Sequence, residues 1–280
     1  MRIDSHHHVW DLSVRAQDWM TSPDFDPINK TILMKDFEPE LAQNRIDYTV
    51  LVQTVTVPEE TPEFLEIAAT NPKVAGVVGW LDLEQDIHSQ LSEYLAHPGS
   101  KKLVAIRDQV QQKSDNKWLE RPEVIKNLKY LGVKNLTYDL LTLPPQLASA
   151  IRAVKECPDT YFVLNHISKP YIAKGELEPW ASNMKTLAKQ ENLAVKISGM
   201  VTEANWKNWT LDDFRPYVEV LLDAFGPKRL MFGSDWPVCL LAASYSQVIN
   251  IAESLTSQLS KDEKEYFWSK TAINSYKLDV

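Results

Sequence analysis

The sequence predicts a (β/α)8 barrel that forms a single domain over residues 1–280. Three observations predict this fold: eight short aliphatic segments recur along the chain, helical segments separate them, and no G-x-G-x-x-G or Walker motif points to a nucleotide-binding fold. Strands that are apolar throughout are typical of parallel strands covered on both faces. A chain of 280 residues, 44% of them hydrophobic, is long enough to build such a barrel.

The predicted strands share runs of β-branched and aliphatic residues. Each is followed by a segment with helix signals, so strand and helix alternate along the chain. The strands are expected over residues 2–5, 48–53, 74–81, 103–107, 136–140, 161–166, 193–198 and 229–234.

Helix signals stand between these strands. The Thr-Pro-Glu sequence at 61–63 supplies a capping residue, a proline at the first helical position and an acid in the first turn, which predicts a helix over residues 63–70. Thr210, with Asp213 three residues later, predicts a capped helix over residues 210–225. Further helices are expected over residues 144–156 and near residues 37–43, the latter inside a long first loop over residues 9–47.

Charge and composition exclude several kinds of partner. A net charge of −8 argues against nucleic acid and against an anionic membrane surface, because both attract basic patches. No apolar run approaches the roughly 20 residues of a membrane span, and the polar N-terminus lacks the apolar core of a signal peptide. Cys157 and Cys239 form no CxxC motif, so we expect no zinc–thiolate site and a reducing, cytoplasmic location. The expected partner is a small molecule, and a homo-oligomer stays open.

Three consecutive histidines follow the first predicted strand. Side chains alternate between the two faces of a strand, so His6 and His8 point the same way and His7 points the other way. Two imidazoles on one face, two residues apart, can chelate a divalent cation. The sequence therefore predicts a metal or electrophilic site at His6 and His8 and a structural role for His7.

Other polar residues follow the later strands, where a barrel of this kind carries its chemistry. Arg107 ends the fourth strand and His166 ends the sixth, with Lys169 three residues further on. Arg107 could equally be a salt-bridge partner, and Lys169 could equally be solvated or hold an oxygen-rich substrate. Lys196 lies within the seventh strand and needs a partner if it is buried.

Asp235 follows the eighth strand and precedes a turn. An aspartate in this position is often a helix cap. Because the same end of the barrel already offers three histidines, we interpret Asp235 as a catalytic carboxylate and as a third candidate metal ligand beside His6 and His8.

Tryptophans gather around the predicted mouth of the barrel. An indole presents a flat apolar face and one donor, which suits the C–H face of a sugar-like ring. Large aromatic residues could equally close long loops over the barrel. The predicted substrate-binding tryptophans are Trp10, Trp80 and Trp236, which follow strands, and Trp118, which lies in a loop.

This ordered set of motifs resembles the amidohydrolase superfamily, and more closely its amidohydrolase-related sugar-lactonase branch. The resemblance covers nearly the whole chain. Its segments are IDSHHHVW at 3–10, VLVQ at 50–53, VGWLDL at 78–83, AIR at 105–107, WLERPE at 118–123, YDLL at 138–141, HISKP at 166–170, KISG at 196–199 and GSDWPV at 233–238.

The resemblance implies a distorted (β/α)8 barrel that hydrolyses an aldonolactone such as fucono- or rhamnonolactone. It implies a site built from His6, His8, His166 and Asp235. One divalent metal, zinc first, would be held by His6, His8 and Asp235, or the enzyme would work without a metal. The superfamily's bridging lysine on strand 4 and metal-binding histidine on strand 5 have no match here, so a two-metal centre is not expected.

Two positions depart from the pattern of the branch. The fourth strand ends with Arg107 and Asp108 where the branch usually has Arg-His, and Asn165 stands where an Asp commonly precedes the strand-6 histidine. Asp108 places an anion where the branch has a neutral or cationic group, which puts the choice of substrate in question.

The resulting hypothesis is water attack on a lactone carbonyl. A cation held by His6, His8 and Asp235, or Arg107 together with the histidines, would polarise the carbonyl. Asp235 would take the proton of the water and later pass it toward the ring oxygen, and His166 would hydrogen-bond the carbonyl or ring oxygen. Arg107, Lys169 and the tryptophans would orient the ring and its hydroxyls. Two alternatives stay open at this point: a metal-dependent decarboxylase of the same superfamily, and a non-catalytic barrel that binds sugar acids.

Overall fold

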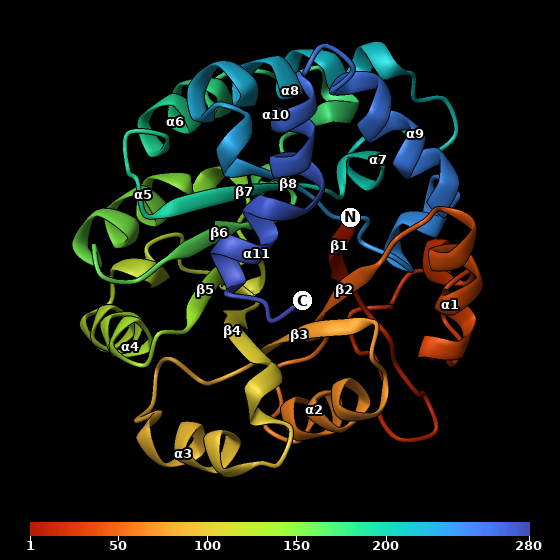
Figure 1. The fold of residues 1–280 in the computed structure, drawn as a ribbon. Helices are drawn as coiled ribbons and strands as arrows, with labels where there is room; N and C mark the ends of the chain where they lie inside the picture. Colours follow the sequence, from red (N-terminus) through yellow and green to blue (C-terminus); the bar gives the residue numbers. More distant parts are fainter.

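The structure, a computed structural model, describes residues 1–280 and confirms the barrel (Figure 1). Its strands are all parallel and lie side by side in chain order, from β1 to β8. The strands are β1 Ile3–His7, β2 Tyr48–Val52, β3 Val74–Gly79, β4 Leu103–Asp108, β5 Thr137–Leu140, β6 Phe162–Leu164, β7 Leu193–Ile197 and β8 Leu230–Phe232.

Helices form a ring around the strands (Figure 1). None of them combines the length and the apolar composition needed to cross a lipid bilayer. The helices are α1 Met34–Gln43, α2 Glu60–Thr70, α3 His88–Ala96, α4 Pro122–Val133, α5 Leu147–Glu156, α6 Trp180–Leu187, α7 Met200–Glu203, α8 Leu211–Phe225, α9 Tyr245–Leu255, α10 Lys261–Glu265 and α11 Thr271–Tyr276.

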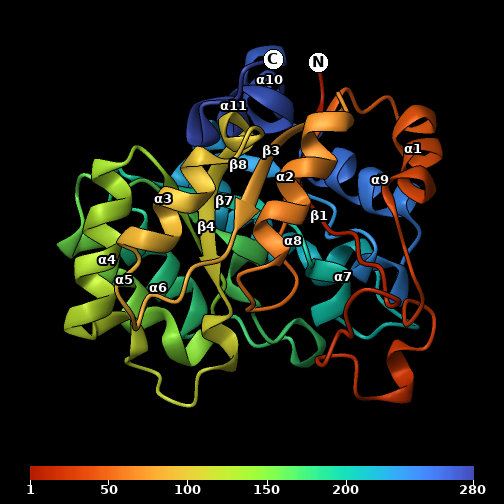
Figure 2. The same ribbon diagram turned by 90° about the horizontal axis from the view of Figure 1, so that it is seen from below.

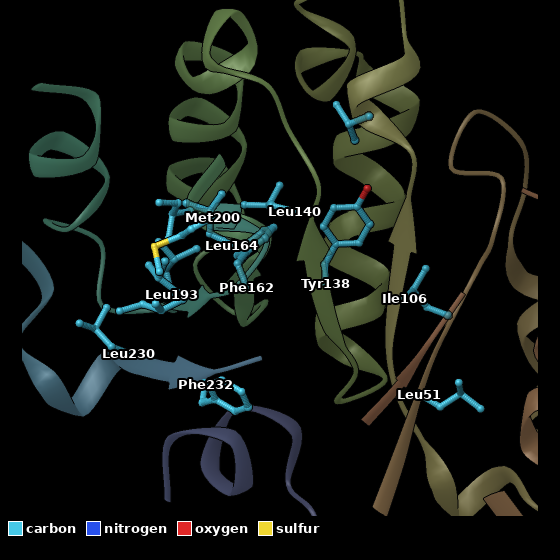
Figure 3. Close-up of a cluster of buried hydrophobic side chains, with 14 of the residues drawn as sticks. Leu51, Ile106, Tyr138, Leu140, Phe162, Leu164, Leu193, Met200, Leu230 and Phe232 are labelled. Atoms are coloured by element: carbon cyan, nitrogen blue, oxygen red, sulfur yellow. The ribbon is translucent and has the colours of Figure 1, made fainter. Parts of the chain in front are cut away.

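Alternation along the strands divides the core into two layers. Leu51 belongs to the larger apolar cluster between the strands and the helices, whereas its neighbours Val50 and Val52 belong to a smaller cluster inside the barrel. Figure 3 shows part of the larger cluster, with Leu51 and Phe232 among the residues that carry it around the sheet. The strands are thus covered on both faces, as their apolar sequences predict.

The two ends of the barrel differ. Both termini lie at one end, together with α10 and α11, and the long loop after β1 lies at the opposite end (Figure 2). Tyr276 and Leu278 belong to the apolar cluster inside the barrel, so the C-terminal segment helps to fill the end that holds the termini. The open end is therefore the one at which the strands finish.

The barrel closes between β1 and the loop that follows β8. The backbone N–H of His8 donates to the carbonyl of Trp236 at 2.7 Å, and that of Asp235 donates to the carbonyl of His6 at 2.9 Å. Because β8 spans only three residues, these two hydrogen bonds are made by the residues that follow the strand. They place the backbone of Asp235 beside the end of β1.

Several boundaries differ from the sequence-based expectation. The first strand continues to His7, whereas β6 and β8 are shorter than expected because the chain turns sharply after each. The helix expected from residue 63 begins at Glu60, and residues 144–146 form a 3-10 turn ahead of α5. The other main expectations hold: Thr210 and Asp213 form the capping box of α8, and residues 9–47 form a long segment with α1 near its end.

Candidate active site

The two histidines expected on one face of β1 do meet. His6 Nε2 and His8 Nε2 lie 3.2 Å apart, and both side chains are buried. The Nδ1–H of His8 donates to the carbonyl of Val52 at 2.7 Å, which leaves Nε2 with its lone pair. His7 points away from this pair and lies against Phe37, with ring centres 4.9 Å apart.

Asp235 completes the group from the loop after β8. Its backbone φ of 61° turns the chain sharply, and its Oδ1 lies 3.4 Å from His8 Nε2 and 3.7 Å from His6 Nε2. The buried carboxylate of Asp4 holds this seam together, since it accepts from the backbone N–H of Ser234 at 2.8 Å and of His6 at 3.1 Å. The three candidate ligands are therefore fixed by backbone contacts between β1 and the closing loop.

The spacing of these three groups fits a divalent cation. Ligands about 2.0–2.1 Å from a tetrahedral zinc ion would lie about 3.3 Å from one another. The observed separations between Oδ1 of Asp235 and the two Nε2 atoms, and between the two Nε2 atoms, run from 3.2 to 3.7 Å. Imidazole nitrogens and carboxylate oxygens are also atoms that commonly coordinate zinc in proteins. His6, His8 and Asp235 could thus hold one metal ion.

His166 reaches the site from an unusual turn after β6. Residues 166 to 169 all have positive φ values, of 50°, 48°, 59° and 47°, and none of them is glycine. A single non-glycine residue in this region is uncommon, and a β-branched one such as Ile167 is rarer still. The turn brings His166 Nε2 to 3.7 Å from Asp235 Oδ1, and Nδ1 to 2.9 Å from the hydroxyl of Ser198.

Gly199 leaves the space that the His166 ring occupies. Its φ is +64°, and a Cβ atom at this position would lie 2.7 Å from His166 Nδ1. Any larger residue would therefore have to displace the ring. The close approach explains why a glycine follows Ser198 at the end of β7.

Burial sets the charges of the site. It lowers the pKa of His166 to about 3, with further lowering from Lys169 and Arg107, although Asp235 opposes the shift. Burial would raise the pKa of Asp235, but the neighbouring His166, His8 and Lys169 outweigh it and bring that pKa down to about 2. Near pH 7 the site therefore has neutral imidazoles around an ionised carboxylate.

Arg107 and Lys196 extend the site inside the barrel. Arg107 is buried, donates to the Gln53 carbonyl and side chain, and places Nη1 3.4 Å from His6 Nε2. Lys196 has the partner that its position requires, since its Nζ lies 2.8 Å from Asp139 and 3.2 Å from His6 Nδ1. His6 is thus enclosed by polar groups from β4 and β7.

A cavity of about 330 Å³ opens onto these groups. Of the predicted site residues, His8, Arg107, His166, Lys169 and Asp235 line it. His6 lies directly behind them. The wall also includes amide and hydroxyl side chains that sequence reasoning did not single out, because isolated Gln and Thr residues in loops carry no motif: Thr54, Gln109, Gln111, Gln112 and Thr202.

The four tryptophans expected to bind substrate do not line this cavity. Trp236 is buried and stacks on Phe37 at 4.2 Å, and Trp10 is buried with its Nε1 donating to the carbonyl of Lys30. Trp118 is buried as well, and Trp80 is half-buried. None of the four is therefore placed to contact a ligand in this cavity.

Other aromatic residues take that place in the cavity wall. Trp19 and Phe25 come from the long loop after β1, and Trp206 follows α7. Trp19 and Phe25 meet edge to face, with ring centres 5.5 Å apart. No local pattern in the sequence distinguishes these residues from the buried tryptophans, since only the path of the loops brings them over the cavity.

Asp108, which departs from the family pattern, does not face the cavity. It follows Arg107 on β4, so it points toward the surrounding helices, where it lies 3.4 Å from Lys113 Nζ. Its Oδ1 also accepts from the backbone N–H of Gln109 at 2.6 Å. Asp108 therefore does not touch the space in which a substrate would sit, so it does not act on the choice of substrate by direct contact.

Known proteins similar to this chain share its length and its fold. The chain is 32% identical to an L-fucono-1,5-lactonase of Burkholderia multivorans, with 99% of this chain and 96% of that protein covered. It is 34% identical to an L-fucono-1,5-lactonase of Burkholderia ambifaria, with 87% and 83% covered. A crystal structure of a Burkholderia multivorans amidohydrolase with bound zinc superposes over the full length of both chains, with a TM-score of 0.94 and 32% identity.

The amidohydrolase family itself matches residues 3–278, which is nearly the whole chain. This match agrees with the barrel and with the arrangement of His6, His8 and Asp235 at its open end. The chain therefore belongs to the amidohydrolase family.

Proposed function

We propose that the protein hydrolyses a sugar lactone by attack of water on the ester carbonyl. The observation that carries this proposal is the convergence of His6, His8 and His166 on the Asp235 carboxylate at the wall of a cavity. A cavity of about 330 Å³ suits a single sugar ring, and its amide and hydroxyl groups suit ring hydroxyls. The similarity to proteins named L-fucono-1,5-lactonase supports an aldonolactone of the fucono type.

In the proposed reaction Asp235 transfers protons, and the other residues of the site orient the substrate or stabilise charge on it. Ionised Asp235 accepts a proton from water as its oxygen bonds to the carbonyl carbon. The ring C–O bond then breaks, and the proton passes to the leaving ring oxygen, which becomes a hydroxyl group. The product is a hydroxy acid that releases one proton near neutral pH.

His166 and Arg107 act on the carbonyl side of the substrate. In the tautomer in which Nδ1 of neutral His166 accepts from the Ser198 hydroxyl, the Nε2–H points to the Asp235 side of the cavity and can donate to the carbonyl oxygen. Arg107 adds a fixed positive charge at the same wall, where negative charge develops during attack. Lys169, Trp19 and Trp206 would hold the ring and its hydroxyls.

We infer that zinc occupies the group formed by His6, His8 and Asp235. A bound divalent cation would supply Lewis-acid polarisation of the ester carbonyl. The lone pair of His8 Nε2, fixed by its Nδ1 contact to Val52, and the 3.2–3.7 Å separations support this assignment. The crystal structure of the zinc-bound amidohydrolase of Burkholderia multivorans supports it as well.

A decarboxylase lacks comparable support. β5 offers no histidine to the site, and its Asp139 is engaged with Lys196, Tyr276 and Asn165. We therefore favour acid release without loss of carbon dioxide.

A pH-indicator screen of aldonolactones tests the proposal. The purified protein should release acid from a six-membered lactone of the fucono type, and elemental analysis should find close to one zinc per chain. Carbon dioxide release from aromatic acids, or binding of sugar acids without turnover of any lactone, would contradict the proposed reaction.

A further inference from the structure

An ion pair stands in the wall of the cavity. Lys169 Nζ lies 3.3 Å from Glu203 Oε1, and both residues line the cavity. Lys169 comes from the end of the left-handed turn after β6, and Glu203 is the last residue of α7. Each side chain is only 22% exposed, so the two charges are partly shielded from water and face each other at close range.

The other cation of the wall also has acceptors of its own. The terminal nitrogens of Arg107 donate to the backbone and side-chain oxygens of Gln53 and to Oδ1 of Asn165 at 3.2 Å. No ammonium or guanidinium end on the wall is thus left without an acceptor from the protein. Apart from the Asp235 carboxylate, the other polar residues of the wall are threonines, glutamines and neutral histidines, none of which carries a positive charge.

This distribution of charge matches some lactones and not others. A carboxylate on the sugar ring needs an unopposed cation or a bidentate arginine when it leaves water. In this cavity Glu203 already forms an ion pair with Lys169, and its negative charge would repel a carboxylate on the substrate. Hydroxyl groups, by contrast, both donate and accept, so they pair with amides and with Lys169 while the ion pair stays intact.

We propose that Glu203 is a specificity determinant that restricts the site to lactones whose ring substituents are uncharged hydroxyl groups. By holding Lys169, it excludes lactones that carry a second, free carboxylate, such as the monolactones of aldaric acids. This inference rests on the proposed lactone hydrolysis and adds the class of substrate that the site accepts.

The test compares two lactones with the same ring, one that carries a hydroxymethyl substituent and one that carries a carboxylate at the same position. Wild-type protein should show a kcat/KM at least about tenfold higher for the uncharged lactone, because a like charge in the wall costs more than about 1.4 kcal/mol. Glu203→Gln should raise kcat/KM for the carboxylate lactone, relative to the uncharged one in the same preparation, by about tenfold. The double variant Lys169→Gln with Glu203→Gln should lose that gain.

Two controls separate specificity from other effects. Glu219→Gln removes the same charge from an exposed position on α8 and should leave the ratio of the two kcat/KM values unchanged. A purely structural role of the ion pair would change both lactones by the same factor. Equal turnover of the two lactones by wild-type protein, or an unchanged ratio in Glu203→Gln, would overturn the inference while leaving the hydrolysis itself in place. Absence of turnover of both lactones would instead refute the proposed function.

Discussion

The contact between Gly199 and His166 allows a sharp test of how the site is positioned. In Gly199→Ala, the new Cβ would lie 2.7 Å from His166 Nδ1, whereas ordinary contact begins at 3.4 Å. The ring would have to retreat by about 0.7 Å. Since a misplacement of about 1 Å can cost about 10²-fold in rate, we expect kcat/KM to fall by about 10- to 100-fold.

Gly175→Ala is the matched control for this variant. Gly175 has a φ of +66°, close to the +64° of Gly199, but a Cβ there would meet nothing within 4 Å. Both variants should lose about 1–2 kcal/mol of unfolding free energy, the cost of a left-handed alanine, and Gly199→Ala should lose more because its Cβ also displaces His166; denaturant titration measures both losses. Only Gly199→Ala should lose lactone hydrolysis in a pH-indicator assay. Activity of Gly199→Ala within twofold of Gly175→Ala would refute the claim that His166 must occupy its observed position.

Three further predictions address other parts of the protein. Burial raises the pKa of Glu60 from 4.5 to about 6, so the folded state holds this proton more tightly than the unfolded state, and the free energy of unfolding should fall as pH rises through that window. In denaturant titrations, Glu60→Gln should remove a fall of about 2 kcal/mol between pH 4 and pH 7. An unchanged pH profile of stability in the variant would contradict this prediction. His8→Ala should lower the zinc content well below the value of wild-type protein by elemental analysis, and full retention would exclude His8 as a ligand. Trp206→Ala should raise KM about 5- to 10-fold with a smaller change in kcat, since contact between an indole and a sugar ring contributes about 1 kcal/mol. An unchanged KM would place the substrate elsewhere in the cavity.

Local sequence patterns predict the framework of this protein well. The run of aliphatic strands separated by capped helices predicts the barrel, and strand alternation predicts that His6 and His8 share a face while His7 does not. These features depend on neighbours in sequence, through side-chain period and helix capping. The same rule explains why Arg107 faces the cavity and Asp108 does not.

The cavity wall follows from contacts between distant segments, which no local pattern encodes. Trp236 and Trp10 follow strands yet pack under the loops, whereas Trp19 and Trp206 reach the cavity from loop segments. The ion pair of Lys169 depends in the same way on α7, a helix of four residues that starts beyond β7.

Asp235 gives the most direct test of the central claim. We predict that Asp235→Asn keeps its fold, as judged by circular dichroism, and hydrolyses a six-membered aldonolactone about 10²–10⁴-fold more slowly than wild-type protein, the usual cost of losing a proton-transfer group. Turnover by the folded variant within tenfold of the wild-type rate would contradict the assignment of this carboxylate to proton transfer, and with it the location of the reaction at this site.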